Sequence, residues 1–453
     1  MPAPRPQLPT AGPKMPAPGP QLPTARPQLP AARPQLPAAG PKMTTTASGP
    51  RDRPALADGG RGVPVRLAPR RFWLWMVGLS AMSAVLVIGG PFNRFVDFPQ
   101  FWYAGQLVGS PDLLDPARQR AWEVAHGFSA FDFLYPPGTA WLYAPLRGLP
   151  LAAAFWVHAA AIALIGVAAG FVGARAFDLD SRVAIVATLA WTPTLAAAAC
   201  GQNAPLAMLL ALVAIDGLRR DRGVVAGLAV GAMLYKPTLA LPMFALLILR
   251  RQWRALFVAM TVAAGWYLLG VAGSAGDWMW PRDWLNFTAP FFAADTSQNV
   301  NKTVALPGLL MGHGVPQIVA YTAAAAVVVA ALPRLLRSPI AEAGAAACLI
   351  GIVVSPHSLQ YEAVMVLPLL LWAAGGTGSG IAEPWRTRLL VAAYLVAQLY
   401  ILTPFAGVSV FAAITFGATA IWITGWQRLE AAPRTPADIP AGARASLTDR
   451  GAP

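Results

Sequence analysis

The sequence predicts an all-α integral membrane protein, and its composition, its run lengths and its periodicity all support this. Of its 453 residues, 56% are hydrophobic and only 12% are charged, whereas a soluble domain usually carries about 25% charged residues. The apolar residues form runs of roughly 17–25, long enough to cross a bilayer core of about 30 Å as helices. The runs lack the period-two alternation of a membrane β-barrel. We therefore expect a bundle of about 10–12 transmembrane helices.

The chain divides into three predicted parts. Residues 1–70 form a tail that is Pro-rich over its first 43 residues, where the unit Pro-Gln-Leu-Pro recurs. A Pro-rich tract cannot form a helix or bury a core, so this tail is expected to be disordered and cytoplasmic. One interpretation is a docking segment for a partner. The other, which we favour, is an expanded repeat, or an upstream start codon with Met43 as the true start. Residues 71–425 form the membrane domain, and 426–453 form a second disordered cytoplasmic tail.

Within the membrane domain, the apolar runs predict the individual spans. They are 72–91, 150–174, 183–199, 204–218, 223–235, 238–249, 255–273, 316–333, 340–354, 361–374, 389–403 and 406–425. The two runs on either side of Lys236-Pro237 are short for a full crossing. This favours two tilted or broken helices, or a re-entrant pair.

The distribution of charge predicts the orientation of the bundle. The net charge is +14, and most of the excess lies in residues 1–71, beside the first span. Basic segments next to a span mark the cytoplasmic side, so this pattern argues against nucleic-acid binding. With the tail cytoplasmic, the basic turns fall on the same face: Arg175, Arg182, Arg219, Arg220, Arg222, Arg250, Arg251, Arg254, Arg334, Arg337, Arg386 and Arg388.

The opposite, extracytoplasmic face receives the polar segments that have no obvious role in solubility. These are the large first loop at 91–150, the turn at 200–203, the break at Lys236-Pro237, the loop at 274–315 and the turn at 355–358. We therefore expect the chemistry of this protein on the extracytoplasmic face of the membrane.

Asp97 is the first candidate for that chemistry. It lies among the aromatic residues Phe98, Phe101, Trp102 and Tyr103, which would desolvate a carboxylate and position it. The aromatic rings, Tyr103 among them, also suit stacking of a lipid or a sugar. The alternatives for Asp97 are a general base and an exposed loop acid or helix N-cap. Tyr135, in the rigid turn Tyr135-Pro136-Pro137-Gly138, is a further candidate contact, although that turn is expected to be structural.

Gln202, Asn203 and Lys236 are candidates at the next two turns. The two amides could bind hydroxyl or phosphate groups, or could cap a helix. An unpaired ammonium between two apolar runs is costly, so Lys236 should have either a buried acid partner or an anionic ligand. We favour the anion, because Pro237 interrupts the helix there.

The last candidates are His357, Glu362 and Lys302. His357 lies close to Ser355, Ser358 and Glu362 in the sequence, and is either a structural histidine or a catalytic or phosphate-binding one. Lys302 belongs to the 274–315 loop, together with the weaker candidates Arg282, Asn299, Asn301 and His313.

Two further residue patterns receive a structural interpretation. Cys200 and Cys348 lie inside or at the end of apolar runs, and are expected to be small buried side chains rather than a disulfide. The acids between residues 112 and 132 are expected to form a solvated surface and not a metal site.

Five short motifs follow one another in an order that resembles glycosyltransferase family 87, a family of membrane enzymes with the GT-C fold. The resemblance covers about residues 71 to 425. The motifs are Asp97-Phe98 with Tyr103-Ala104-Gly105, Tyr135-Pro136-Pro137, Gly201-Gln202-Asn203, Lys236-Pro237, and Ser355-Pro356-His357-Ser358 with Tyr361. The Pro-rich tail has no counterpart in the family.

This resemblance implies a multi-pass GT-C enzyme of the cytoplasmic membrane, with a large first extracytoplasmic loop. The implied donor is a polyprenyl-phosphate sugar, typically mannose, although some similar enzymes transfer arabinofuranose. The implied acceptor is a glycolipid or polysaccharide of the cell envelope. Asp97 matches the essential acid of the first loop and would deprotonate the acceptor hydroxyl, so that the sugar is transferred with inversion. No cofactor is implied, because a monophosphate donor does not demand a metal clamp.

The other candidates then become contacts to the substrates. Lys236 and His357 would bind the lipid phosphate, and Gln202 the sugar or the phosphate. The remaining predicted contacts are Tyr103, Tyr135, Asn203, Lys302 and Glu362. Two alternatives stay open at this point: a transporter or flippase of lipid-linked sugars, and a non-catalytic subunit of a membrane assembly.

Overall fold

A computed structural model describes residues 70–89, 97–128, 132–375, 383–402 and 409–425. The predicted tails at 1–70 and 426–453 lie outside these residues except for Arg70, as do the first residues of the predicted 91–150 loop. The described chain is almost entirely helical. Its β pairing is limited, within these ranges, to an isolated bridge between Thr303 and Leu359. The prediction of an all-α membrane protein is confirmed.

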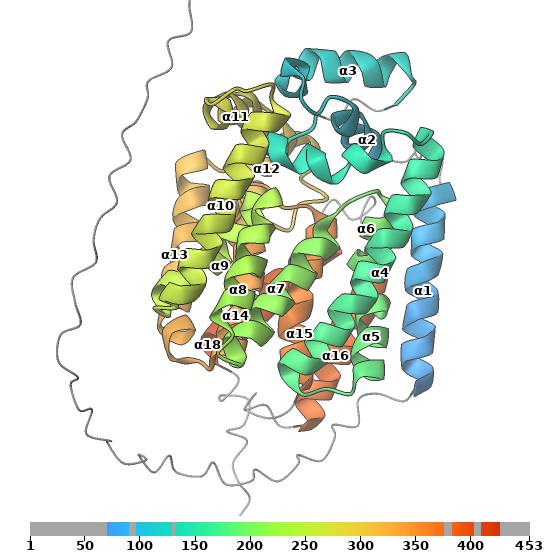
Figure 1. Ribbon diagram of the computed structural model, residues 1–453. Coiled ribbons are helices and arrows are strands. Elements are labelled where there is room, and N and C mark those ends of the chain that lie inside the picture. Colours follow the sequence, from blue (N-terminus) through green and yellow to red (C-terminus); the bar gives the residue numbers. More distant parts are fainter. Residues whose placement is uncertain (1–69, 90–96, 129–131, 376–382, 403–408, 426–453) are drawn as a thin grey trace, which may run out of the picture. The chain divides into compact units, whose positions relative to one another are not determined.

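The helices of the bundle run side by side between two ends (Figure 1). They are α1 (Arg70–Gly89), α4 (Leu151–Phe177), α5 (Ser181–Ala190), α6 (Thr192–Ala199), α7 (Ala204–Arg219), α8 (Gly223–Ala232), α9 (Pro237–Leu249), α10 (Trp253–Gly273), α13 (Gln317–Arg337), α14 (Ile340–Val354), α15 (Leu367–Ala374), α16 (Glu383–Gln398) and α18 (Val410–Thr424).

The remaining elements cover one end of the bundle or join its helices. They are α2 (Phe98–Gln106), η1 (Pro111–Leu114), α3 (Pro116–Ala125), η2 (Pro137–Leu142), η3 (Ala144–Leu146), η4 (Met233–Tyr235), α11 (Trp280–Gln298), α12 (Leu306–Gly312), η5 (Gln360–Val366) and η6 (Leu399–Leu402). Of these, α2, α3, α11 and α12 lie at the upper end in Figure 1, which we call the loop end.

Three helices of the described chain, α4, α10 and α13, are each long and apolar enough to cross a membrane alone. Most other apolar helices of the bundle, such as α9, α14 and α18, have 10–17 residues and lie alongside them. The predicted continuous span at 183–199 is instead broken into α5 and α6, which meet at an angle of 58°. Trp191 adopts an extended conformation between them. Pro193, in the first turn of α6, has no backbone N–H with which to continue α5.

The break predicted at Lys236-Pro237 is present, and it separates two short helices. α8 is followed by the single 3₁₀ turn η4, and Lys236 then leaves the helical conformation with φ −135° and ψ 83°. Pro237 starts α9 at a position where its missing N–H costs nothing. The chain therefore reverses at Lys236, which places this side chain at the loop end.

The arginine-rich turns gather at the opposite end of the bundle, which we call the basic end (Figure 1). Arg175 and Arg220 both pair with Asp216, at 3.0 and 2.6 Å. Arg250 donates to the carbonyl of Ser338 at 2.7 Å. These contacts tie α4 to α7, and the end of α9 to the end of α13, so the predicted segregation of basic turns to one side agrees with the fold.

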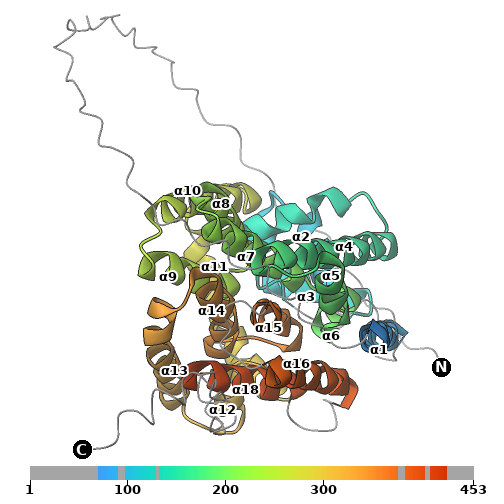
Figure 2. The same cartoon turned by 90° about the horizontal axis from the view of Figure 1, so that it is seen from below.

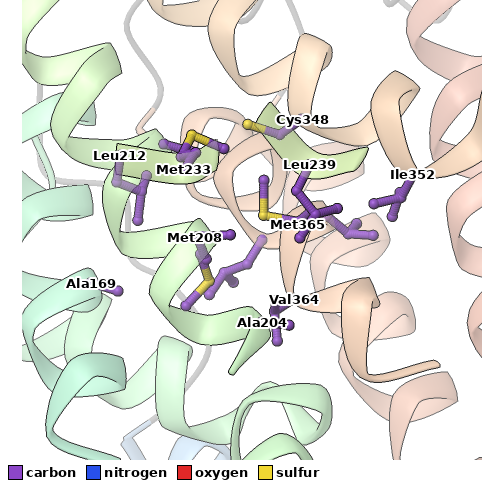
Figure 3. Close-up of a cluster of buried hydrophobic side chains, with 14 of the residues drawn as sticks. Ala169, Ala204, Met208, Leu212, Met233, Leu239, Cys348, Ile352, Val364 and Met365 are labelled. Atoms are coloured by element: carbon purple, nitrogen blue, oxygen red, sulfur yellow. The ribbon is translucent and has the colours of Figure 1, made fainter. Parts of the chain in front are cut away.

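The core lies where the central helices meet, and Figure 2 shows α7, α14 and α15 in the middle of the bundle. Methionine and branched side chains from α7, η4, α9, α14 and η5 fill this region (Figure 3). Cys348 is among them, and both it and Cys200 are buried free thiols. The interpretation of the cysteines as small core residues is therefore confirmed.

Candidate active site

The turn at Cys200-Gly201, at the loop end, holds Asp97 in place. Its backbone N–H donates to the carbonyl of Cys200 at 3.1 Å. Gly201 follows with φ +73°, and a Cβ added there would lie 2.5 Å from the Cβ of Phe98. Only glycine therefore allows this turn to touch the start of α2. Asp97 occupies the N-cap position of α2, but its side chain makes no capping bond. The carboxylate is instead buried, with 9% of the residue exposed.

A chain of hydrogen bonds runs from Asp97 to a buried ion pair. Gln202 Nε2 donates to Asp97 Oδ2 at 2.6 Å, and the Tyr135 hydroxyl donates to Gln202 Oε1 at 3.2 Å. Lys236 Nζ donates to the Tyr135 hydroxyl oxygen at 3.1 Å, and pairs with Glu362 Oε1 at 2.5 Å. Residues from five separate segments, far apart in the sequence, thus form one connected polar network, which we call the Asp97 chain.

The Lys236–Glu362 pair closes the far end of this chain. The second carboxylate oxygen of Glu362 accepts the backbone N–H of Leu359 at 2.7 Å. The Lys236 ammonium lies 5.3 Å from the ring centroids of both Tyr135 and Tyr361, a distance at which a cation is attracted to an aromatic face. Of the two alternatives for Lys236, the structure shows the buried acid partner. A phosphate-binding role for this lysine stays a prediction.

Asn203 anchors the chain to the surrounding tyrosines. Its Nδ2 donates to the Tyr143 hydroxyl at 2.9 Å, and its carbonyl accepts from the Tyr235 hydroxyl at 2.8 Å. Tyr135 also donates to Asn203 Oδ1, at 3.3 Å. Burial raises the pKa of Tyr135 well above 10, and the negative charges of Glu362 and Asp97 raise it further. The Tyr135 hydroxyl therefore stays protonated, and remains a donor, at neutral pH.

Three predicted site residues do not belong to the Asp97 chain. Tyr103 stacks on Trp122 of α3, with ring centroids 4.3 Å apart. His357 is half-buried, and its ring meets that of Phe291 edge-on at 6.1 Å. Lys302 is exposed and makes no ion pair with the described residues.

Lys302 nevertheless lies close to the start of the chain. Burial raises the pKa of the Cys200 thiol to about 12, the negative charge of Asp97 raises it, and the positive charge of Lys302 lowers it. The charges of Asp97 and Lys302 therefore both act on the turn at Cys200. This makes Lys302 an unneutralised cation in the neighbourhood of Asp97.

Sequence reasoning missed His158 on α4. Its buried ring lies beside those of Phe98 and Tyr143, with centroids 5.1 and 5.7 Å away. Its Nε2 has no hydrogen-bond partner among the described residues. The signal was present, because an ionisable residue inside an apolar span is by default a functional candidate. As to metals, no group of three or more His, Cys, Asp or Glu within the described ranges could hold an ion.

Residues 133–356 match the model of glycosyltransferase family 87. The chain carries a glycosyltransferase family 87 domain. The protein is therefore a membrane glycosyltransferase, which excludes the non-catalytic subunit and disfavours the transporter. No curated protein and no solved structure matches the chain.

The matched segment covers only part of the Asp97 chain. It includes Tyr135, Gln202, Asn203 and Lys236. It begins after Asp97 and ends before Glu362. These two acids are connected to the matched segment by the Gln202–Asp97 hydrogen bond and the Lys236–Glu362 ion pair.

Proposed function

We propose that this glycosyltransferase moves mannose from a polyprenyl-phosphate carrier to a hydroxyl group of a cell-envelope glycolipid or polysaccharide, with Asp97 as the general base. The observation that carries the proposal is the buried Asp97 carboxylate, held through Oδ2 by an amide whose own oxygen is fixed by Tyr135. A base must be oriented before the substrate arrives. The Asp97 chain supplies that orientation without placing a second negative charge next to the carboxylate.

The reaction follows from these groups. Asp97 takes the proton of the acceptor hydroxyl while its oxygen attacks the anomeric carbon from the side opposite the phosphate. The bond from that carbon to the phosphate oxygen breaks, and polyprenyl phosphate leaves with the electron pair. The configuration at the anomeric carbon is inverted, and Asp97 later releases the proton to water. The carboxylate also stabilises the positive charge that develops on the sugar.

The phosphate of the donor needs a positive group that is not already neutralised. Lys236 is paired with Glu362 at 2.5 Å, so its attraction for a further anion is reduced. Lys302 is exposed, and its charge reaches the turn that holds Asp97. We therefore assign the phosphate contact to Lys302, with His357 as a second candidate, and we assign Lys236 to the positioning of Asp97. A donor with one phosphate needs no divalent cation, so EDTA should leave the rate unchanged.

The orientation in the membrane is part of the same proposal. The arginine-rich basic end would face the cytoplasm, by the positive-inside rule, and the loop end with Asp97 would face the outside of the cytoplasmic membrane. There it would meet a lipid-linked sugar and an envelope acceptor. A polyprenyl-phosphate arabinofuranose donor is the alternative within the same mechanism.

The test uses membranes that contain the protein, labelled polyprenyl-phosphate mannose and octyl mannoside as a synthetic acceptor. Asp97→Asn should lower the transfer rate by about 10²–10⁴-fold, the usual contribution of a positioned base. Asp112→Asn is the matched control, because Asp112 is an acid of the same loop that pairs with Arg118 at the surface. It should retain full activity. Undiminished transfer by Asp97→Asn would refute the base assignment, and transfer from the arabinofuranose carrier alone would replace mannose.

A further inference from the structure

η5 contributes to a second polar pair besides the Lys236–Glu362 pair of the Asp97 chain. Glu362 points to Lys236 from this short helix, whereas Gln360, two residues earlier, donates through Nε2 to the Tyr400 hydroxyl at 3.0 Å. Tyr400 belongs to η6, the turn after α16. η5 thus contributes one residue to the Lys236–Glu362 pair and one to the Gln360–Tyr400 pair.

In the Gln360–Tyr400 pair, part of the hydrogen-bonding capacity is unused. Gln360 Oε1 is buried and has no hydrogen-bond partner among the described residues. Tyr400 accepts from Gln360, and its own O–H proton meets no acceptor within the same ranges. Turning the amide would exchange the two roles and would still leave one donor and one acceptor. A buried polar group without a partner calls for a water molecule or a ligand.

This pair also lies close to Asp97. η5, which carries Gln360, packs against α6, and Cys200 is the C-cap residue of α6. Cys200 is the residue whose carbonyl accepts the Asp97 N–H. The unused donor and acceptor therefore border the same turn as the proposed base.

One unused donor beside one unused acceptor is complementary to a hydroxyl group, which can fill both roles at once. We propose that Gln360 and Tyr400 bind a hydroxyl group of a sugar ring next to Asp97, with the hydroxyl donating to Gln360 Oε1 and accepting from the Tyr400 O–H. This subsite rests on the proposed glycosyl transfer at Asp97. The ring can be that of the transferred sugar or that of the acceptor, and the two sources are separated by experiment.

The experiment measures initial rates of the full-length protein, with polyprenyl-phosphate mannose and octyl mannoside varied in turn. Tyr400→Phe and Gln360→Met each remove one of the two hydrogen-bonding groups. Each should raise the KM of one substrate by about tenfold, with kcat changed less than about twofold, since the lost bond is made in the ground state as well. A higher KM for the donor places the transferred sugar at this pair, and a higher KM for the acceptor places the acceptor ring there.

Tyr394→Phe is the matched control. Tyr394 is a buried tyrosine of α16, six residues before Tyr400, and its hydroxyl donates to the carbonyl of Ala187 at 2.9 Å. It should leave both KM values unchanged. The double variant Tyr400→Phe/Gln360→Met should raise KM no more than the stronger single variant, because both groups serve one hydroxyl.

Unchanged KM values in both Tyr400→Phe and Gln360→Met, or a loss confined to kcat, would overturn the subsite and would mean that water occupies it. That failure is distinct from failure of the proposed function, which is read from Asp97→Asn. Full activity of Asp97→Asn beside an elevated KM of Tyr400→Phe would refute the base while leaving the subsite in place.

Discussion

Two ion pairs with a buried acid, one at each end of the bundle, look alike locally and differ in what they connect. Lys236 pairs with Glu362 at the loop end, and Arg334 pairs with Glu342 at the basic end, at 2.5 and 3.0 Å. Each cation also faces an aromatic ring: Arg334 lies 5.1 Å from the Trp422 ring centroid. By burial and pairing alone, the two sites would receive the same interpretation.

The difference lies in the next hydrogen bond. At the basic end, Trp422 Nε1 donates to the same Glu342 oxygen that Arg334 contacts, at 3.0 Å, so the cluster closes on itself. At the loop end, Lys236 continues through Tyr135 and Gln202 to Asp97. A buried ion pair by itself does not indicate a functional site, because structural ion pairs are buried as well. A connection to a second buried acid, Asp97, is what distinguishes the loop-end pair.

The largest expected effect comes from neutralising the two acids in parallel. Glu362→Gln should destabilise the fold by about 3 kcal/mol, because the buried Lys236 loses its partner, and Glu342→Gln should destabilise it less, because Arg334 is only half-buried. Glu362→Gln should also lower kcat by roughly 100-fold, since unpaired Lys236 would disturb the groups that position Asp97. Glu342→Gln should keep its kcat per folded molecule. Thermal unfolding and specific activity measure the two effects, and equal losses of kcat would erase the distinction between the pairs.

A smaller effect is expected from cutting one hydrogen bond in each cluster. Tyr135→Phe removes the donor that fixes the Gln202 amide, so kcat should fall by about tenfold while the donor KM is retained. Trp422→Phe removes the donor to Glu342, and should cost about 1 kcal/mol of stability with no change in kcat. Steady-state kinetics at saturating donor tests this pair of variants. A rise in donor KM for Tyr135→Phe would instead make Tyr135 a substrate contact.

The smallest effect concerns exposed cations at the two ends. Lys302 and Arg254 are both exposed, and neither makes an ion pair with the described residues. Lys302→Met should raise the KM for polyprenyl-phosphate mannose by about fivefold, since an exposed ion pair contributes up to about 1 kcal/mol. The effect should weaken as salt is added. Arg254→Met should leave the KM unchanged, and the same shift in both variants would mean general attraction of the lipid and no specific contact.

The order of motifs along the chain was enough to find most of the Asp97 chain. Asp97, Gln202 and Lys236 were predicted at turns on one side of the membrane, because polar residues there have no obvious role in solubility. Glu362 was predicted as a substrate contact, and its pairing with Lys236 was not foreseen. Nothing in the spacing of two residues that are 126 positions apart indicates that a proline break and a 3₁₀ turn bring their side chains together.

Other features escaped prediction for similar reasons. The apolar run at 183–199 has span-like composition, but its bend depends on a single extended residue, Trp191, before a proline. Gln360 and Tyr400 look like ordinary polar residues near the ends of spans. Their unused hydrogen bonds become visible only when every neighbouring group can be counted.

The sequence by itself determined that the protein is a helical membrane bundle, which end is basic, and which family it resembles. These properties follow from composition, run length and local motifs, and all of them are readable along the chain. Only the tertiary structure decided which polar groups are partners. It pairs Lys236 with Glu362, and it connects this pair to Asp97 through hydrogen bonds of Tyr135 and Gln202. It also leaves one donor and one acceptor of Gln360 and Tyr400 without a partner among the described residues. The physical reason is that hydrogen bonds and ion pairs act over about 3 Å in space, and helix packing sets those distances between residues that the sequence keeps far apart.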